Sequence, residues 1–401
     1  MKTSFNFPYP LVILLVCLVT AFFGCDKDPE LPADTPPDTS GTPTVSIEDI
    51  RMNELQTIGS HNSYRLKTYE PIFVLLTGGT PPPGLNPQEW DYTHETLPTQ
   101  FGTHRVRSIE LDIHYDPGGG LFANREGNAF VGDSTASNIP ALDYPGMKVI
   151  HVPDLDYNTN YYTFVEALSA VKAWSDANPT HLPLIVMVEL KTNIISLPNF
   201  AAVLPFTVTA LDEVDMEIES IFESTLNNII TPEILRGTYA SVNEAVLAGA
   251  WPTLAEARGK IFFVAMASST EISDYMQGYP GMIGRNMFMF SEAGLGETAF
   301  IIKNDPVANQ DTIRALVQAG YMVRTRADAG TWEARSGDYS RMNMALASGA
   351  QIISTDYYRP DPRADTSSIW TNYSVNFPNL ETAILNPING PAKFAGLAIT
   401  E

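Results

Sequence analysis

The sequence predicts a single α/β domain folded as a TIM-type (β/α)8 barrel, regular or irregular. Three observations predict it. Eight short runs of β-forming residues alternate with longer segments of helical character. The part of the chain with folded composition is long enough for one barrel of roughly 250 residues. Polar clusters follow the first four runs, at the strand ends where such barrels carry their active sites.

The predicted strands are short apolar runs bounded by turn residues or by helical segments. They cover residues 56–59, 106–112, 148–151, 184–189, 260–265, 287–290, 322–326 and 351–355. Helices are predicted between them at 162–178, 215–227 and 312–318, where apolar residues recur at helical spacing. Gly320 suits the C-terminus of the last of these helices, just before a strand.

The net charge of the chain restricts the kinds of molecule that it can bind. The 401 residues include 24 Lys and Arg against 46 Asp and Glu, which gives a net charge of −22. Such a surface repels nucleic acid and has no electrostatic attraction for anionic lipid. Binding of an anionic substrate therefore requires a local positive centre, such as a metal ion.

The N-terminus resembles an export signal. Lys2 precedes an apolar run from residue 11 to 23, which is too short for a membrane span of about 20 residues, and Gly24–Cys25 follows it. We interpret residues 1–24 as a lipoprotein signal peptide and Cys25 as the lipid anchor; a plain secretory signal or a short anchor are the alternatives. The prediction is a lipid-anchored bacterial cell-envelope protein, at the outer membrane or the cell surface.

Cysteine usage narrows the chemistry. The chain has two cysteines, Cys17 within the apolar run and Cys25. With Cys25 lipidated, no thiol is left for a disulfide, a thiolate metal site or a Cys nucleophile. Residues 25–44 are rich in Pro, Asp and Thr and are expected to form a disordered tether. The barrel is expected at 45–358, and residues 359–401 are expected to wrap its surface in an unknown role.

Polar residues end the first four predicted strands. They are His61 and Asn62, Glu110 and Asp112, His151, and Glu189 with Lys191. Residues i and i+2 of a strand point the same way, so Glu110 and Asp112 share a focus, and Glu189 and Lys191 do likewise. Carboxylate and amide oxygens are the ligands of a hard cation such as Ca²⁺. Two histidines can act as base and acid on opposite sides of phosphorus, so phosphodiester cleavage is the reaction class that fits.

These motifs resemble a known family. Residues 58–64 (IGSHNSY), 108–112 (SIELD), 149–151 (VIH) and 186–191 (VMVELK) are similar to the catalytic region of calcium-dependent phosphatidylinositol-specific phospholipase C. Residues 324–328 (RTRAD) and 353–358 (ISTDYY) are similar to the last two strands of its bacterial branch. The resemblance extends over residues 55–358 and implies a PLC-like phosphodiesterase barrel that acts on phosphatidylinositol or a related inositol phospholipid.

The resemblance also implies roles. His61 and His151 would be the catalytic pair, and Asn62, Glu110, Asp112 and Glu189 the Ca²⁺ ligands. Lys191 would lie near the substrate phosphate, and Arg326, Asp328 and Tyr357 would contact inositol hydroxyls. His151 would protonate the diacylglycerol leaving group, and a cyclic inositol phosphate would form. His61 would help to take the hydroxyl proton or stabilise the transition state, with Glu110 and Glu189 as rival bases.

Metal dependence has a separate indicator. Metal-independent relatives place an arginine on the second strand, where the calcium would sit, and neither inward position of residues 110–112 is arginine. Of the remaining histidines, His114 could face the same focus. His94, His104 and His181 are expected on the remote face of the barrel, in structural roles.

Two other functions compete. A glycerophosphodiester phosphodiesterase also uses two histidines, a Glu-x-Asp pair and a divalent ion, but its first motif is His-Arg-Gly where this chain has His61-Asn62-Ser63. A surface lipoprotein that binds inositol phosphates or glycans without turnover is the alternative of another class. The intact histidines and carboxylates favour catalysis over binding alone.

Overall fold

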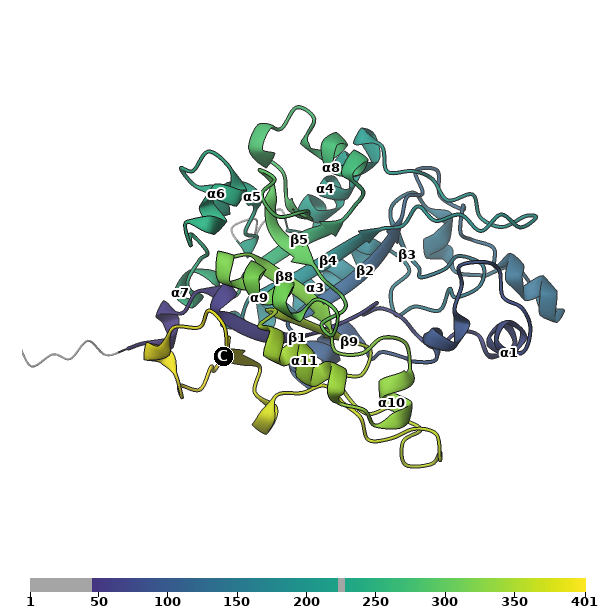
Figure 1. Ribbon diagram of the computed structural model, residues 1–401. Helices are drawn as coiled ribbons and strands as arrows, with labels where there is room; N and C mark the ends of the chain where they lie inside the picture. The colour runs from purple at the N-terminus through teal and green to yellow at the C-terminus, as the bar shows by residue number, and fades with distance from the viewer. Residues whose placement is uncertain (1–44, 223–227) are drawn as a thin grey trace, which may run out of the picture. The chain divides into compact units, whose positions relative to one another are not determined.

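A computed structural model describes residues 45–222 and 228–401 (Figure 1). Eight parallel strands form a closed ring in the order β1–β9–β8–β7–β6–β5–β4–β2, and pairing of β1 with β2 closes it. The ring strands are β1 Leu55–Ser60, β2 Ser108–His114, β4 Leu184–Leu190, β5 Ile261–Met266, β6 Met287–Phe290, β7 Thr298–Ile302, β8 Met322–Arg326 and β9 Ile352–Thr355. The predicted TIM-like α/β barrel is confirmed.

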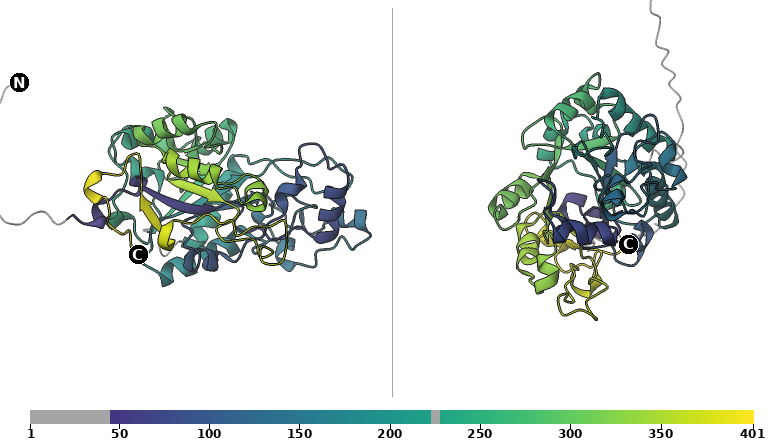
Figure 2. Two further views of the ribbon diagram at one scale, coloured as in Figure 1. Left: turned by 60° about the horizontal axis from the view of Figure 1, so that its bottom comes forward. Right: turned by 90° about the vertical axis from the view of Figure 1, so that its right-hand side faces the viewer.

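Helices surround the ring (Figures 1 and 2). The α-helices are α1 Glu70–Gly78, α2 Leu97–Gly102, α3 Phe164–Ala177, α4 Val208–Phe222, α5 Pro232–Arg236, α6 Val242–Leu247, α7 Leu254–Ala257, α8 Ser269–Met276, α9 Gln310–Ala319, α10 Trp332–Ser336 and α11 Ser340–Ser348. Short 3-10 helices are η1 Ile47–Asp49, η2 Met52–Glu54, η3 Pro87–Trp90, η4 Glu126–Val131, η5 Pro140–Asp143, η7 Pro280–Met282, η8 Pro378–Leu380 and η9 Ala392–Phe394. None of the helices in residues 45–222 and 228–401 is long and apolar enough to cross a membrane.

The predicted strands differ from the observed ring in one exchange. The run at 148–151 yields only β3 Lys148–Val149, which pairs antiparallel with the end of β2 and lies outside the ring. The ring strand missing from the prediction is β7. Only residues 291–297 connect it to β6, so no helix separates the two parallel strands. The predicted count of eight was right because these two errors cancel.

The predicted helices hold with shifted ends. Thr163 caps α3, where its side chain accepts a hydrogen bond from the Glu166 amide, and Gly320 ends α9 in the left-handed region at φ 107°. Helix α4 begins at Val208, before the expected residue 215, because apolar residues already recur at helical spacing there. Residues 223–227 of that predicted helix, and residues 1–44 with the signal peptide, Cys25 and the tether, lie outside the described residues.

The interior of the ring is apolar at its centre and charged at its carboxyl end. Phe262, Phe288 and Phe300, on three neighbouring strands, pack with ring centroids 5.2–6.5 Å apart. Arg324 points to the same side as Met322, two residues earlier, and Met322 pairs with Phe300 across β7 and β8. Arg324 of β8 reaches Glu110 of β2 through the interior. The apolar packing therefore supports a charged layer at the strand ends.

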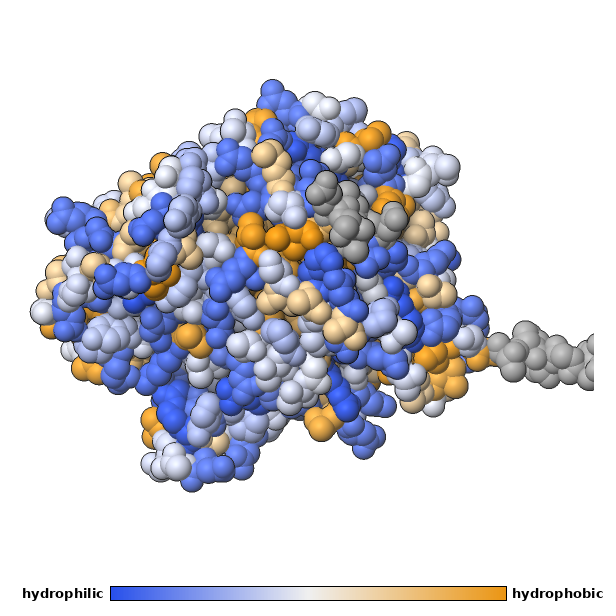
Figure 3. Space-filling model, turned by 180° about the vertical axis from the view of Figure 1, so that it is seen from behind, coloured by the Kyte–Doolittle hydropathy of each residue, from blue (hydrophilic) through white to orange (hydrophobic). Residues whose placement is uncertain are grey.

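Residues 359–401 run from the carboxyl end of the barrel to its amino end. Near their start, Arg335 and Arg363 each lie 4.1 Å from the ring centroid of Trp370. The strand β10 Ala383–Leu385 then pairs antiparallel with β1. The last residues cover the amino end, where Phe394 and Ile399 pack in an apolar cluster with Ile50, Leu55 and Leu182. The face in Figure 3 shows small separated apolar patches among polar residues.

Candidate active site

The loop after β1 is fixed to β2 and aims His61 at the mouth of the barrel. The His61 amide donates to the Thr355 carbonyl of β9, at 3.0 Å. Asn62 adopts φ 45°, the left-handed region that asparagine tolerates, so the chain turns directly after His61. Ser63 then forms two bonds with Glu110 of β2: its amide donates to the Glu110 carbonyl, and its hydroxyl accepts from the Glu110 amide, each at 2.8 Å. The turn thus holds His61 and Asn62 beside the carboxylates of β2.

His61 belongs to a His–Asp–Arg relay. Its Nδ1 lies 2.8 Å from Asp356 Oδ1, and Arg326 donates to Asp356 Oδ2 at 2.7 Å. Burial, together with the charge of Arg326, lowers the pKa of His61 to about 3 although Asp356 opposes the shift. The ring is therefore neutral near pH 7, with Nδ1–H on Asp356. Its Nε2 faces the pocket, 3.7 Å from Glu110 Oε1.

His151 belongs to a second relay of the same kind. Its Nδ1 lies 2.6 Å from Asp156 Oδ2, and Arg65 holds both oxygens of Asp156, with Nε at 2.6 Å from Oδ2 and Nη2 at 3.0 Å from Oδ1. Burial would raise the pKa of Asp156, but Arg65 and His151 outweigh it and bring that pKa to about 2. Burial also lowers the pKa of His151 against the pull of Asp156. Trp90 packs on the His151 ring in a T-shaped arrangement, with centroids 5.6 Å apart.

An acidic cluster lies beside His61. Ligand atoms of Glu110, Asp112 and Glu189 all lie within 4.8 Å of one another, and the first two residues are buried. Burial raises the pKa of Glu110 and of Asp112, against the neighbouring positive charges. The amide oxygen of Asn62 is buried and has no hydrogen-bond partner within residues 45–222 and 228–401. Three carboxylates and a free amide oxygen are a donor set that fits Ca²⁺.

Two side-chain cations already lie against this cluster. Lys191 Nζ is 3.3 Å from Asp112 and 3.0 Å from Glu189, and these charges raise the pKa of Lys191 although burial opposes them. Arg324 Nη2 is 2.6 Å from Glu110 Oε2. Strand β2 carries no arginine, as predicted, but Arg324 reaches the same place across the barrel from β8 and was not predicted. Spacing could have found it, because Arg324 stands two residues before Arg326 on one strand.

The predicted substrate-binding residues fall into two groups. Lys191 and Arg326 line pockets, beside His151 and His61 respectively. Asp328 is fully buried, accepts a hydrogen bond from the Asp356 amide, and has its pKa raised to about 7 by burial and by Asp356. Tyr357 is 2% exposed. Contact of Asp328 and Tyr357 with inositol stays a prediction, as do the roles of the other residues of the site.

The remaining histidines differ in position. His114 is buried, contacts the Ile150 carbonyl at 3.0 Å, and is not among the residues that form the acidic cluster. His94 was predicted on the remote face, and this was wrong: its Nε2 donates to the His61 carbonyl at 2.7 Å. The chain folds back after α1 and η3, which places His94 under His61. His104 pairs with Glu95, and His181 contacts Ser175 in the core.

Two pockets are lined by the histidines of the relays, one by His61 and the other by His151. The reaction pocket, about 380 Å³, is lined by His61, Glu110, Glu189, Arg324 and Arg326 together with residues after β4, β5 and β7. A narrower pocket of about 80 Å³ reaches His151 and Lys191. Its other lining is mostly apolar and includes Leu85, Val152, Ile195, Phe200 and Val203. Polar and charged side chains therefore line most of the pocket at His61, whereas mostly apolar side chains line the pocket at His151.

Exposed apolar side chains gather around the His151 pocket. Val74 and Leu75 on α1 are 57% and 42% exposed, Phe130 of η4 is 54% exposed, and Ile194 is 63% exposed. Phe130 packs on Phe200 with centroids 5.9 Å apart, and the neighbouring residues of all these segments share one apolar cluster. We call Val74, Leu75, Phe130 and Ile194 the apolar rim. Helix α1, which carries Val74 and Leu75, lies in the lobe that projects from one end of the barrel (Figure 1).

The fold and the site define an α/β barrel with two histidine relays beside a candidate cation site. Residues 50–387 match the family model of Ca²⁺-dependent phosphoinositide phospholipase C, and the chain therefore belongs to this family. No curated protein matches the chain.

Solved structures with a similar chain trace include calcium-dependent phosphoinositol-specific phospholipase C from Pseudomonas sp, at 15% identity and TM-score 0.47, with 77% of this chain and 91% of that one covered. The calcium-dependent enzyme of Streptomyces antibioticus has the same identity and TM-score, with 80% and 99% covered. Phosphatidylinositol-specific phospholipase C of Listeria monocytogenes shows 12% identity and TM-score 0.42, with 78% and 90% covered.

Proposed function

We propose that this protein is a Ca²⁺-dependent phosphodiesterase that cleaves phosphatidylinositol, or a related inositol phospholipid, to diacylglycerol and an inositol phosphate through a cyclic intermediate. One observation carries the proposal. Two histidines, each held through Nδ1 by an aspartate that also binds an arginine, open beside a cluster of three carboxylates, two of them buried. Phosphodiester cleavage needs a base, an acid and positive charge at the phosphoryl oxygens. The two histidines would supply the first two, and a cation held by the carboxylates would supply the third.

The reaction would run as an internal transfer followed by hydrolysis. The inositol 2-hydroxyl oxygen forms a bond to phosphorus, its proton passes to a base, and the bond from phosphorus to the glycerol oxygen breaks. His61 is one candidate base, since its Nε2 is unprotonated at neutral pH; Glu110 and Glu189 are the others. Ca²⁺ held by Asn62, Glu110, Asp112 and Glu189 would supply charge stabilisation and lower the pKa of the attacking hydroxyl.

His151 would protonate the departing glycerol oxygen. Its lowered pKa means that the free site holds a neutral ring. An anionic phosphate next to Nε2 favours the imidazolium, and Asp156 already stabilises that charge at Nδ1. The leaving group would then lie against the apolar pocket and the apolar rim, with the acyl chains in the membrane. The inositol ring would lie on the opposite side, in the reaction pocket with His61 and Arg326.

The test is release of diacylglycerol from phosphatidylinositol vesicles, with and without a calcium chelator. We expect release that the chelator abolishes and added Ca²⁺ restores. Cleavage of glycerophosphoinositol with no cleavage of the lipid would instead favour a glycerophosphodiester phosphodiesterase. Vesicle binding without any product would favour a binding lipoprotein. Either outcome would overturn the proposal.

We also propose that the chain is exported to the bacterial cell envelope and anchored by lipid on Cys25. The support is the short apolar run that ends at Gly24–Cys25, followed by the Pro-rich stretch before the barrel. An anchor compensates for a charge of −22, which gives no attraction to anionic lipid. Cys25→Ala should release the protein from membranes and leave hydrolysis of a soluble substrate unchanged. Mass spectrometry that finds Cys25 unmodified in the mature protein would contradict this.

A further inference from the structure

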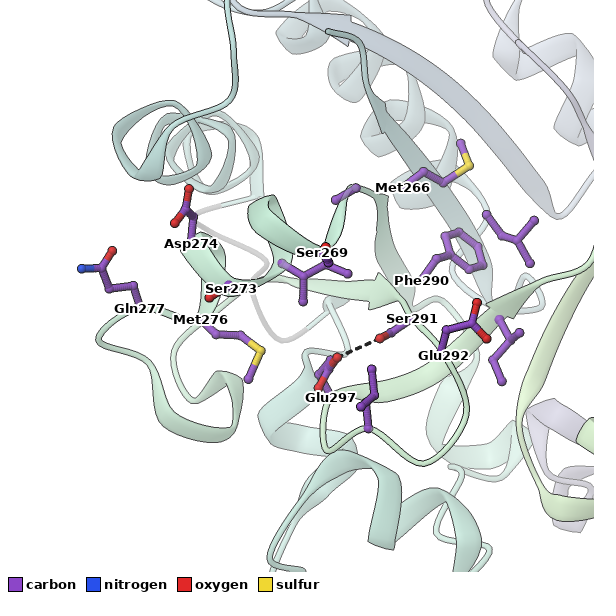
Figure 4. Close-up of a pocket in the computed structure, with 15 residues that line it drawn as sticks. Met266, Ser269, Ser273, Asp274, Met276, Gln277, Phe290, Ser291, Glu292 and Glu297 are labelled. Carbon is purple, nitrogen blue, oxygen red and sulfur yellow. Dashed lines mark hydrogen bonds between the residues drawn. The ribbon is translucent and has the colours of Figure 1, made fainter.

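A cavity of about 300 Å³ lies apart from the active site. The larger cavity of about 820 Å³ at the carboxyl ends of β5, β6 and β7 does not, because Met266 and Ala267 line both it and the reaction pocket (Figure 4). None of the eleven residues that line the smaller cavity, all in the described part of the chain, lines the pocket of His61 or that of His151. We call this smaller space the side cavity; the proposed reaction does not use it.

The side cavity lies outside the ring of strands, against β1. Ile58 lines it and points to the same side of β1 as Ser60. The hydroxyl of Ser60 donates to the side chain of Gln100 of α2, at 2.7 Å, so this side of β1 faces the surrounding helices. Six of the eleven lining residues belong to the C-terminal residues 359–401. This segment, whose role the sequence left open, therefore contributes the larger part of the lining.

The floor of the side cavity is apolar and already in place. Tyr358 and Phe377 line it and are 2% and 3% exposed. The Tyr358 hydroxyl accepts a hydrogen bond from the Glu95 amide, at 2.9 Å, and the ring of His94 stacks on Tyr358 with centroids 5.3 Å apart. An apolar group that enters the cavity therefore meets a preformed surface, as in most small-molecule sites.

Unpaired charges of both signs line the same cavity. The guanidinium of Arg105 forms no ion pair or hydrogen bond within residues 45–222 and 228–401. Arg359 Nε lies 3.4 Å from Glu95 Oε1, but it is buried and makes no hydrogen bond, and His104 occupies the other oxygen of Glu95 at 2.9 Å. The carboxylate of Glu381 also forms no ion pair within the described residues. The cavity thus offers two cationic donors and a separate carboxylate to a ligand.

We propose that the side cavity binds a free amino acid with an apolar side chain. The carboxylate of the ligand would accept hydrogen bonds from Arg105 and Arg359, and its ammonium group would pair with Glu381. Its side chain would pack on Tyr358 and Phe377. A volume of about 300 Å³ is at the lower end for ligand pockets, which suits a molecule of this size better than a lipid. The proposal does not depend on the phosphodiesterase reaction.

Two other classes of ligand fit the lining less well. A simple anion such as phosphate would meet the like charge of Glu381 and would leave the apolar floor uncovered. A wholly apolar molecule would remove the cationic groups from water and give them no partner, which costs free energy. A zwitterion with an apolar side chain satisfies both signs of charge and the floor together.

The experiment measures the affinity of the full chain for four probes by calorimetric titration. They are L-phenylalanine, 3-phenylpropionate, which lacks the ammonium group, 2-phenylethylamine, which lacks the carboxylate, and inorganic phosphate. We expect phenylalanine to bind most tightly, phenylpropionate about threefold to fivefold more weakly, and phenylethylamine at least about tenfold more weakly. Phosphate should not bind. No binding of phenylalanine at about 10 mM, or equal binding of phosphate or phenylethylamine, would overturn the inference.

Variants locate the binding in the side cavity. Arg105 has φ 56°, in the left-handed region that asparagine tolerates, so Arg105→Asn removes the charge and keeps the backbone. We expect Arg105→Asn and Arg359→Gln each to weaken phenylalanine binding at least about fivefold. Glu381→Gln should weaken the binding of phenylalanine but not of phenylpropionate. Lys393→Gln is the control for loss of one positive charge, because Lys393 is exposed and outside the lining.

The variants also give the inference a second way to fail. Affinity for phenylalanine that is unchanged in both Arg105→Asn and Arg359→Gln would place the ligand elsewhere and overturn the assignment. A loss of affinity in Lys393→Gln as large as in Arg105→Asn would do the same, because it would reduce the effect to net charge. Release of diacylglycerol is measured separately, so neither outcome is confused with a failure of the proposed function.

Discussion

The two halves of the site present the same relay from different parts of the fold. His61 stands directly at the end of a ring strand, and its aspartate and arginine come from the ends of β9 and β8. His151 stands in an irregular segment after β3, outside the ring. Its partners Asp156 and Arg65 also come from loops. Barrel geometry therefore fixes the first relay, whereas a buried salt bridge between two loops fixes the second.

The surroundings differ more than the relays do. Nε2 of His61 faces Glu110 at 3.7 Å, and Arg326 Nη1 at 3.5 Å. His151 lies against Trp90 and a mostly apolar pocket. His61 thus lies among charged side chains, where we propose that it exchanges a proton with the substrate. The other lies where an apolar leaving group would depart. The comparison indicates that equal hydrogen-bonding frames can serve unequal roles.

The largest expected effect is a loss of kcat/KM on substitution of either histidine, and it should separate the roles of His61 and His151. In the proposed reaction diacylglycerol would leave as a poor alkoxide and need a proton from His151, whereas a phenol-like leaving group departs as an anion. We expect His151→Ala to lose about 10²–10⁴-fold in kcat/KM on phosphatidylinositol and to be substantially rescued on the activated substrate. His61→Ala should stay impaired on both. The measurement is the kcat/KM ratio of the two substrates in each mutant at saturating calcium.

Two outcomes would break this division. Equal losses on both substrates in His151→Ala would mean that His151 is not the leaving-group acid. Rescue of His61→Ala would mean that the two roles are assigned to the wrong histidines.

Substitution of the aspartate in each relay tests whether the loop relay and the barrel relay contribute differently to stability. Arg65 is fully buried, so Asp156→Asn leaves a buried charge without its carboxylate and should lower the free energy of unfolding by about 3 kcal/mol. Arg326 is partly exposed and lies 4.0 Å from Asp328, so Asp356→Asn should cost only about 1.5 kcal/mol. Urea unfolding of both variants measures this, together with kcat/KM. Equal costs in stability would contradict the distinction between loop and barrel support.

A matched control is available on the same face. Asp91 binds Arg335 and Arg363 and holds no histidine. Asp91→Asn should lower stability to a similar modest extent and leave kcat/KM unchanged. A loss of activity there would show that any broken Asp–Arg pair disturbs the mouth of the barrel.

The fold could be predicted from local pattern, with one instructive failure. Strand runs such as 184–189 and 260–265 are apolar on both faces because parallel barrel strands are buried on both sides. β7 was missed because the expected helix before it does not exist. Lys148–Val149 was taken for a ring strand because a run of this length carries no information on the direction of its pairing. Topology of this kind is decided by contacts far apart in the sequence.

The candidate site was predicted more fully than its support. The convergence of Glu110, Asp112 and Glu189 followed from strand alternation. Asp356 and Arg65 were not found, because the bonds from His61 to Asp356 and from Arg65 to Asp156 span 295 and 91 residues. Asp156 is only five residues from His151, but both stand in an irregular segment whose pairing no strand or helix period indicates. Arg324 was also missed, although its position two residues before Arg326 on β8 could have indicated that it points into the barrel. A sequence displays residues suited to a metal or to proton transfer, but not the distant partners that hold them in place.

The next prediction concerns the carboxylates beside His61, which we expect to bind Ca²⁺. Ca²⁺ that binds only the folded form adds stability, so it should raise the melting temperature by several degrees at saturation. Asp112→Asn should remove most of that rise, and Glu110→Gln likewise, although the latter also breaks the pair with Arg324. Asp311→Asn, an exposed acid of α9, is the control for loss of one charge. An unchanged calcium response in both site variants would contradict the assignment.

The last prediction concerns the protonation of His94, whose ring bonds to the His61 carbonyl. His94 is 3% exposed, and burial lowers its pKa to about 4, against an ordinary value of 6.5. The unfolded chain therefore takes up a proton on His94 as the pH falls below about 6.5, while the folded protein does not until about pH 4. The contribution of His94 to stability is complete above pH 6.5 and is lost across that window, at up to about 1.4 kcal/mol per pH unit.

The support of His151 has no titration in this window, because the pKa of Asp156 is lowered to about 2 and Arg65 stays charged throughout. Wild-type stability alone cannot isolate His94, since burial raises the pKa of Asp328 and of Glu217 to about 7 each, and such groups add stability as the pH falls. The difference between wild type and His94→Gln removes these common contributions. Glutamine keeps a donor for the His61 carbonyl, so stability at pH 7.5 should change little. Between pH 6.5 and 4.5 the variant should lose stability less steeply, by about 1 kcal/mol per pH unit. If the free energies of unfolding of wild type and variant, measured in urea, changed in parallel across this range, His94 would not stay neutral in the folded protein. The His61 half of the site would then show no pH dependence of its own.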